Sequence, residues 1–328
     1  MIGQGGPGAA LLRGAGLLLS RGPEGRRLVI LHYHRVPAAP DPLCPELLER
    51  DVFAVHMAAL ADVFQVMSLS DGLAGLRDGS LPSRAVVITF DDGYADNFQV
   101  ALPVLQHFGL TATFFVAAGF LDGGCMFNDL VIEACRVAPP GAWRTGIPLL
   151  GDVVAGDAPA RVALAGQLIA RLKYREPGER LELAGRLLAS AGGRQPDHLM
   201  MTSDEVRGLD RAGMEIGGHT LTHPILARLP DADARREIAG GRAALESLVG
   251  HPVRHFAYPN GKPGEDYLPR DVALARDLGF DAALTTVWAA ATRRDDRFQV
   301  PRVGSWDRTR ARFCARLLRC YRETSSAA

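Results

Sequence analysis

Two short stretches of the sequence hold residue types that together can bind a metal ion and activate water. Asp91 and Asp92 are adjacent carboxylates in the run Thr-Phe-Asp-Asp-Gly, and such crowding is costly unless a cation neutralises one of them. His219 and His223 lie four residues apart in the run His-Thr-Leu-Thr-His-Pro, so both imidazoles can reach one ion. Taken alone, the first stretch can equally be a solvated Asp-Asp-Gly turn, and the second an ordinary pair of histidines.

The two stretches are more specific together than apart. One carboxylate and two imidazoles leave coordination positions for water and substrate, and the second carboxylate is free to take a proton from that water. Helical His-Glu-x-x-His metallopeptidases have the same histidine spacing, but here Thr220 stands at the glutamate position, and Gly and Pro flank the pair. The sequence therefore disfavours a peptidase.

Both stretches directly follow a predicted strand. Residues 85–90 form a continuous apolar and β-branched run, which is typical of a strand buried on both faces, and residues 214–217 form a shorter strand. In parallel α/β folds, catalytic groups gather where strands end. From Leu28 onward short β-like runs alternate with longer helical ones, and we count six or seven strand–helix units. The sequence predicts an α/β fold class.

The predicted organisation has three parts. Residues 1–27 form an N-terminal segment of undetermined structure, residues 28–308 form the α/β domain, and residues 309–328 form a C-terminal helix and tail. A helical insertion at about 120–200 interrupts the strand–helix rhythm, with an irregular stretch at 141–156. The insertion has three candidate roles: a lid, a binding wall and an oligomer surface.

Composition narrows the class of partner and the compartment. Lys+Arg and Asp+Glu balance at 37 each, so no net field draws nucleic acid to the protein. Five cysteines at irregular spacing form neither a disulfide framework nor a thiolate zinc site, which predicts reduced thiols. The apolar stretch at 9–20 is interrupted by Arg13, and no transmembrane segment is predicted. We expect a cytoplasmic protein, with association with the inner face of the membrane as the alternative.

The order of three motifs resembles the polysaccharide deacetylases of carbohydrate esterase family 4, which carry the NodB homology domain. The third motif is Phe-Ala-Tyr-Pro-Asn-Gly at 256–261, a form similar to that of the branch acting on exopolysaccharides and poly-N-acetylglucosamine. The resemblance covers about 28–307 apart from the insertion. It implies a distorted (β/α)7 barrel with a helical insertion, in agreement with the number of strand–helix units.

The resemblance also implies a role for each residue of the motifs. Asp91 is implied as the general base, and the implied metal ligands are Asp92, His219 and His223. The metal would polarise the acetamide carbonyl while Asp91 deprotonates the attacking water. The Tyr position of the third motif is Asn260 here, so its backbone N–H is the implied oxyanion donor.

Two positions depart from the family pattern. Ala257 stands where many members have an arginine that steadies the base; Arg302, which follows a strand-like run, is our candidate replacement, and an ordinary surface arginine is the alternative. Thr286 stands where a late histidine usually supplies the general acid. Either metal-bound water returns the proton or another histidine serves. His34, which follows the first predicted strand, is our candidate, with a structural hydrogen-bonding role as the alternative.

The implied activity is removal of N-acetyl groups from an amino-sugar oligo- or polysaccharide. The expected partner is therefore a glycan that contains N-acetylhexosamine. The expected cofactor is a divalent metal, with Zn2+ in first place and Co2+, Ni2+, Mn2+ or Fe2+ as alternatives. Two other functions remain open: a non-catalytic glycan-binding protein on the same fold, and a related amidohydrolase that acts on a small carbon–nitrogen substrate.

Overall fold

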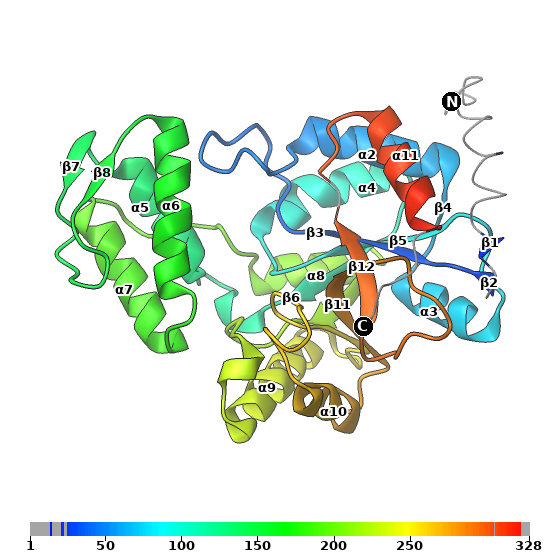
Figure 1. The fold of residues 1–328 in the computed structure, drawn as a ribbon. Coiled ribbons are helices and arrows are strands. Elements are labelled where there is room, and N and C mark those ends of the chain that lie inside the picture. Colours follow the sequence, from blue (N-terminus) through cyan, green and yellow to red (C-terminus); the bar gives the residue numbers. More distant parts are fainter. Residues whose placement is uncertain (1–13, 15–20, 23–24, 305, 323–328) are drawn as a thin grey trace.

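The chain folds into a barrel and a smaller lobe of helices (Figure 1). The computed structural model describes residue 14 and residues 21–22, 25–304 and 306–322. Most of the predicted segment 1–27 lies outside the described residues, and so does the end of the predicted C-terminal tail, 323–328.

Parallel strands of the described chain close into a seven-stranded barrel, which confirms the predicted (β/α)7 fold class (Figure 1). Its strands are β3 (Val29–Tyr33), β5 (Ala85–Phe90), β6 (Thr113–Val116), β9 (Glu215–Gly218), β10 (His255–Ala257), β11 (Ala282–Trp288) and β12 (Val300–Gly304). Their order around the barrel is β3–β12–β11–β10–β9–β6–β5. Strand β5 closes the ring by pairing with all of β3, and the short strand β4 (Gln65–Val66) extends β5 outside the ring.

Strand β5 shows why the sequence predicts buried parallel strands. Every residue from Ala85 to Phe90 is buried, because neighbouring strands cover the edges and side chains cover both faces. At its carboxyl end, Phe90 stacks on Phe114 of β6 with ring centroids 4.7 Å apart. This packing fixes the point at which the chain leaves β5.

Helices cover the outside of the barrel. They are α2 (Arg50–Val63), α3 (Leu69–Asp78), α4 (Leu102–His107, after a π-helical turn at Asn97–Ala101), α8 (Ser203–Arg211), α9 (Asp231–Val249), α10 (Pro269–Asp277) and α11 (Arg310–Cys320). Helix α8 starts with a capping box in which Thr202 and Glu205 accept each other's backbone N–H groups. Helix α11 packs against α2, where Phe313 stacks on His56 at 3.9 Å between ring centroids. The predicted C-terminal helix therefore joins the barrel core.

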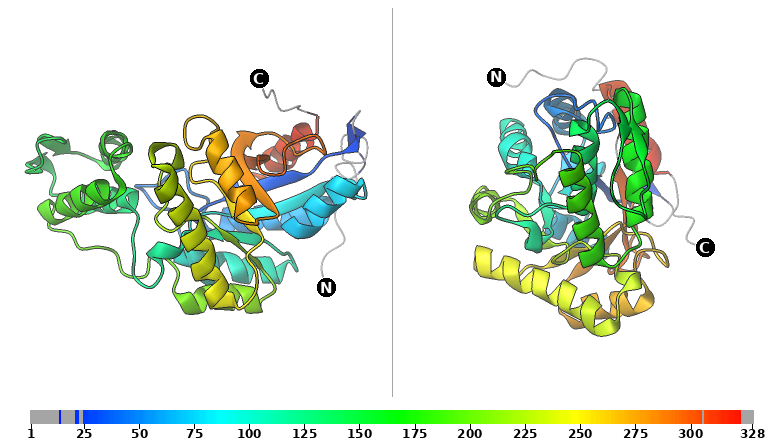
Figure 2. Two further views of the ribbon diagram at one scale, coloured as in Figure 1. Left: turned by 90° about the horizontal axis from the view of Figure 1, so that it is seen from below. Right: turned by 90° about the vertical axis from the view of Figure 1, so that its left-hand side faces the viewer.

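The insertion forms a lobe with a hydrophobic cluster of its own. It contains α5 (Phe127–Val137), the antiparallel strands β7 (Gly141–Trp143) and β8 (Val153–Ala155), α6 (Ala158–Leu172) and α7 (Pro177–Ser190). The predicted irregular stretch thus contains a short strand pair. The lobe projects beyond the barrel in Figure 1 and in the left view of Figure 2. Arg136 of α5 ties it to the barrel through two hydrogen bonds to Asp41, at 2.9 and 2.7 Å.

Two further findings bear on the composition. In the part of the chain that the structure describes, no helix is both long and apolar enough to span a membrane. All five cysteines are buried and none forms a disulfide: Cys44, Cys125, Cys135, Cys314 and Cys320.

Candidate metal centre and active site

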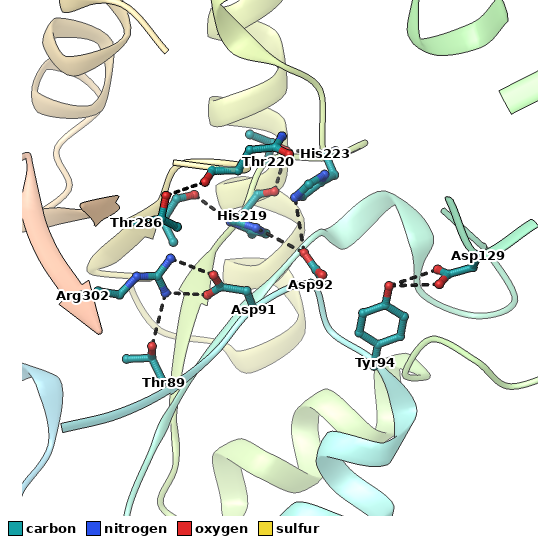
Figure 3. A network of polar contacts seen from close by, with 12 residues as sticks. Thr89, Asp91, Asp92, Tyr94, Asp129, His219, Thr220, His223, Thr286 and Arg302 are labelled. Atoms are coloured by element: carbon teal, nitrogen blue, oxygen red, sulfur yellow. Dashed lines mark hydrogen bonds and ion pairs between the residues drawn. The ribbon is translucent and has the colours of Figure 1, made fainter. Parts of the chain in front are cut away.

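Three side chains converge at the carboxyl ends of two barrel strands, as a metal site requires (Figure 3). Asp92 follows β5, and His219 and His223 follow β9. The Asp92 Oδ1 atom lies 3.4 Å from His219 Nε2 and 3.3 Å from His223 Nε2. One ligand atom from each residue lies within 4.8 Å of the other two. The three residues predicted as metal ligands are therefore brought together.

The surrounding backbone orients these ligand atoms. His219 Nδ1 lies 2.7 Å from the carbonyl oxygen of Ala257, so the ring donates there and turns Nε2 toward Asp92. Asp92, Thr220 and His223 have φ values of 81°, 66° and 51°, in the left-handed region. Residues other than glycine rarely adopt this backbone conformation, and β-branched residues such as Thr220 do so least of all. Such strain clusters at functional sites.

The donor set suits a divalent cation. Asp92 Oδ1 is buried and has no hydrogen-bond partner among the described residues, and such an orphaned oxygen is costly unless a cation binds it. Burial lowers the pKa of His223 to about 4, so its imidazole is neutral and can act as a ligand. Burial also opposes the charged form of His219, but Asp92 and Asp91 outweigh it and raise its pKa. A metal ion would displace that proton.

Asp91 lies beside this cluster and is held by Arg302 of β12. The guanidinium reaches Asp91 Oδ1 and Oδ2 at 2.7 Å each, and both side chains are almost fully buried (Figure 3). Arg302 Nε also donates to the Thr285 carbonyl at 2.9 Å. Burial alone would raise the pKa of Asp91, but the positive charge of Arg302 holds it well below its usual range. The carboxylate is therefore ionised and fixed in orientation.

The loop after β10 lines the same cavity through Asn260. Asn260 has a φ of 59°, and its N–H donates to no acceptor within the described chain. Thr286 Oγ1 donates to the Asn260 carbonyl at 2.7 Å, so the threonine at the usual histidine position clamps this loop. Gly261 is required beneath it, because a Cβ atom there would lie 2.8 Å from the Thr286 backbone N.

His34 follows β3 and lines the cavity that contains the three predicted metal ligands. This cavity has a volume of about 340 Å³. His32 lies on β3 itself with its ring edge against His34, at 5.7 Å between centroids. Burial lowers the pKa of His32 to about 3, which keeps its ring neutral.

The insertion supplies one wall of this cavity, including Lys173 and Arg180, which sequence reasoning missed. The cavity is lined from this lobe by Met126, Phe127, Asn128, Ile169, Lys173 and Arg180. Arg180 donates to the His223 carbonyl at 2.9 Å, which links the lobe directly to a predicted metal ligand. No local signal marks Lys173 or Arg180, because each belongs to an ordinary amphipathic pattern and only the packing of the lobe brings it to the site.

Comparison with known proteins agrees with the fold and the site geometry. The family model for polysaccharide deacetylases matches residues 78–137 and 157–283, more than half of the chain. The chain belongs to this family, whose members are hydrolases that act on carbon–nitrogen bonds in acetylated polysaccharides. The predicted family and enzyme class are confirmed.

A relative in Bacillus subtilis (strain 168), the protein YxkH, is classed with the polysaccharide deacetylases. It is 37% identical over 279 residues, which cover 84% of this chain and 71% of YxkH. Among solved structures, the Streptococcus pyogenes deacetylase PplD has a TM-score of 0.61 at 17% identity, covering 90% of this chain and 99% of PplD. IcaB from Ammonifex degensii has a TM-score of 0.57 at 21% identity, covering 90% and 98%. These structures share the fold.

Proposed function

We propose that the protein is a metal-dependent N-deacetylase that hydrolyses acetamide groups on an N-acetylhexosamine-containing oligo- or polysaccharide. The observation that carries this proposal is the ion pair between Asp91 and Arg302 beside the converging ligands of the metal centre. It places an ionised, oriented carboxylate next to three metal-ligand groups, the combination that acetamide hydrolysis by activated water requires.

Each residue of the site would have a separate role in the reaction. Asp92, His219 and His223 would hold the metal, which we propose to be Zn2+ because a carboxylate with two imidazoles suits that ion. A divalent ion there would supply Lewis acidity toward the acetamide carbonyl and would lower the pKa of water. Asp91 takes the proton of the water as it attacks the carbonyl carbon.

Two further groups act on the tetrahedral intermediate. The backbone N–H of Asn260 donates a hydrogen bond to the developing oxyanion, as its free donor and the Thr286 clamp allow. His34 lines the cavity and is our candidate for donating a proton to the departing amine. Arg302 is a positioning residue, since it acts through Asp91.

The shape of the site favours a glycan over a small amide. The cavity of the metal ligands adjoins one of about 480 Å³, with which it shares Phe127 and Arg180, and one of about 300 Å³, with which it shares His34 and Asp92. The last also reaches Trp306, which is 57% exposed. An extended cleft with an exposed indole suits several sugar rings, and the complete ligand set disfavours a merely glycan-binding protein.

The cysteines bear on the compartment. All five are buried and none forms a disulfide, and reduced thiols persist where glutathione and thioredoxin maintain them. This supports the proposed cytoplasmic location.

The test is acetate release from N-acetylglucosamine oligomers by the full chain. We expect release by the Zn2+-loaded protein, loss of release with a chelator and recovery when Zn2+ is returned. Asp91→Asn should bind one Zn2+ as the wild type does and release at least ~100-fold less acetate, because the general base is lost. No acetate from any amino-sugar oligomer tested with metal-loaded, folded protein would refute the proposal.

A further inference from the structure

One wall of the metal cavity carries positive charge that the proposed reaction does not use. Lys173, at the end of α6, and Arg180, on α7, line the same cavity as Asp92 and His223. We propose that these two cations form a subsite for an anionic group of the glycan, carried by the sugar next to the reacting N-acetylhexosamine. This inference rests on the proposed function and deepens it by naming the substrate class.

Arg180 is a buried charge with no counter-ion among the described residues. It is 6% exposed, and its hydrogen bonds go to the carbonyl oxygens of His223 and Lys173, at 2.9 and 3.3 Å. Its guanidinium also lies 4.6 Å from the ring centre of Phe127. In the described part of the chain, no carboxylate oxygen lies within 4.0 Å of Arg180 or Lys173 as an ion-pair partner. Buried arginines are normally paired, so a partner from outside the chain would complete this one.

The carboxylates nearest to Arg180 are already engaged elsewhere. Glu176 and Glu237 are the acidic groups whose charge reaches it. Glu237 accepts from the Thr222 backbone N–H at 2.8 Å, and Glu176 caps α7 by accepting from the Glu179 N–H at 2.9 Å. Their oxygens therefore stabilise loop and helix backbone and leave the cations facing the cavity.

The carboxylates that line the cavity do not offset this charge either. Asp91 is neutralised by Arg302, and Asp92 belongs to the metal ligands. With a divalent ion bound, the ligand group would carry one net positive charge, and Lys173 and Arg180 add one each. A half-enclosed cleft lined by one sign of charge focuses its field on oppositely charged ligands. The loaded cavity would thus select for an anionic substrate.

Carboxylate and phosphate share the chemistry that these side chains recognise. A guanidinium pairs with either through parallel hydrogen bonds. The ammonium of Lys173 lies 5.6 Å from the ring centre of Tyr174, and its long flexible stem, which lines the cavity, lets it turn toward a bound anion. The anion can therefore be the carboxylate of a uronic acid or a phosphate group on the neighbouring unit. The experiment distinguishes these two sources.

The test compares three oligomers of matched length with the metal-loaded full chain. One is neutral N-acetylglucosamine, one alternates N-acetylglucosamine with glucuronic acid, and one carries a terminal phosphate. At low ionic strength we expect kcat/KM to be roughly tenfold higher for a charged oligomer than for the neutral one, and the difference to shrink as salt is added. The charged oligomer that shows the larger preference identifies the source.

Variants assign the preference to the proposed residues. Lys173→Gln should remove most of the preference through a rise in KM for the charged oligomer, since only the side-chain charge changes. Arg186→Gln is the matched control: it removes an exposed cation from the same helix as Arg180 but lies outside the cavity, so the preference should persist. Equal kcat/KM for charged and neutral oligomers, or an unchanged preference in Lys173→Gln, would overturn the subsite while deacetylation stands.

A binding measurement keeps the two proposals separate. Calorimetry on chelator-treated protein, which does not turn over, should show roughly fivefold tighter binding of the charged oligomer, and Lys173→Gln should abolish the difference. This result supports the subsite even if no oligomer releases acetate, which would refute the proposed function alone. Equal binding of charged and neutral oligomers would overturn the subsite.

Discussion

Replacing Arg302 by methionine tests the central feature of the site. Methionine keeps an unbranched, flexible stem in the barrel interior but removes the guanidinium that bonds both oxygens of Asp91 at 2.7 Å. The Asp91 carboxylate would then remain buried, with a side-chain exposure of 3% and no counter-charge from β12. Such an uncompensated charge is costly, so both stability and catalysis should suffer.

The magnitude follows from the burial of the pair. Breaking a buried ion pair by removing one partner costs about 3–5 kcal/mol. The low pKa of Asp91 means that the pair stabilises the fold above the unfolded pKa of the carboxyl, and this contribution is lost as pH falls through the folded pKa. Without Arg302, burial raises the pKa of Asp91, so the acid limb of the kcat/KM profile should move to higher pH.

Denaturant unfolding and a pH–rate profile measure the two effects. Arg310→Met is the matched control, because Arg310 pairs with Asp62 at 2.8 Å with both side chains more than a quarter exposed. It should cost less than about 1 kcal/mol and leave the profile unchanged. If Arg302→Met loses less than about 1 kcal/mol and keeps the acid limb of the wild type, then the pair neither stabilises the fold nor orients the base.

Three further predictions concern single side chains. Thr286→Val should lower kcat roughly tenfold with little change in KM, because the Asn260 carbonyl loses its hydrogen bond from Thr286. Thr286→Ser should restore activity, and equal rates for the valine and serine variants would exclude a role for this hydrogen bond. His34→Gln should lower kcat at least ~100-fold while the protein still binds one Zn2+, and a change below twofold would rule out a proton donor at this position. Burial lowers the pKa of His56 to about 4, so the free energy of unfolding should fall as pH drops from the usual His pKa of about 6.5 to about 4, by up to about 3 kcal/mol. His56→Gln should flatten this part of the stability curve and the exposed His107→Gln should not; identical slopes would contradict the assignment.

The barrel could be predicted because its elements have one dominant periodicity. Residues 85–90 and 231–249 form a strand and a helix with the bounds that their apolar patterns indicate. The stretch at 141–156 was predicted as irregular, whereas the structure pairs two strands of three residues there. So short a pair has no periodicity of its own, and its Trp143 is buried only because the lobe folds around it. Tertiary packing decides this element.

The candidate site was predictable to the extent that its residues follow one another along the chain. Asp91, Asp92, His219 and His223 occur in compact runs after strands, so their convergence follows from the parallel barrel. Arg302 lies beside Asp91, as the prediction required, although 211 residues separate the two in the sequence. The role of Arg302 in catalysis stays a prediction. The family resemblance suggested Arg302 as a candidate, but its local sequence equally allowed a surface arginine, because the pairing depends on which strand lies across the barrel interior.

Strands β11 and β12 connect Asp91 to the loop of Asn260, although these residues belong to separate sequence motifs. Arg302 holds the base from β12 and donates to the Thr285 carbonyl on β11, while the next residue, Thr286, clamps the Asn260 loop. The proposed base and the proposed oxyanion donor are thus both held by adjacent residues of β11, so a shift of this strand would move them together. Groups fixed to a rigid strand keep their separation better than groups fixed to loops. This explains how the site can keep its geometry although Ala257 and Thr286 stand where the family usually has an arginine and a histidine.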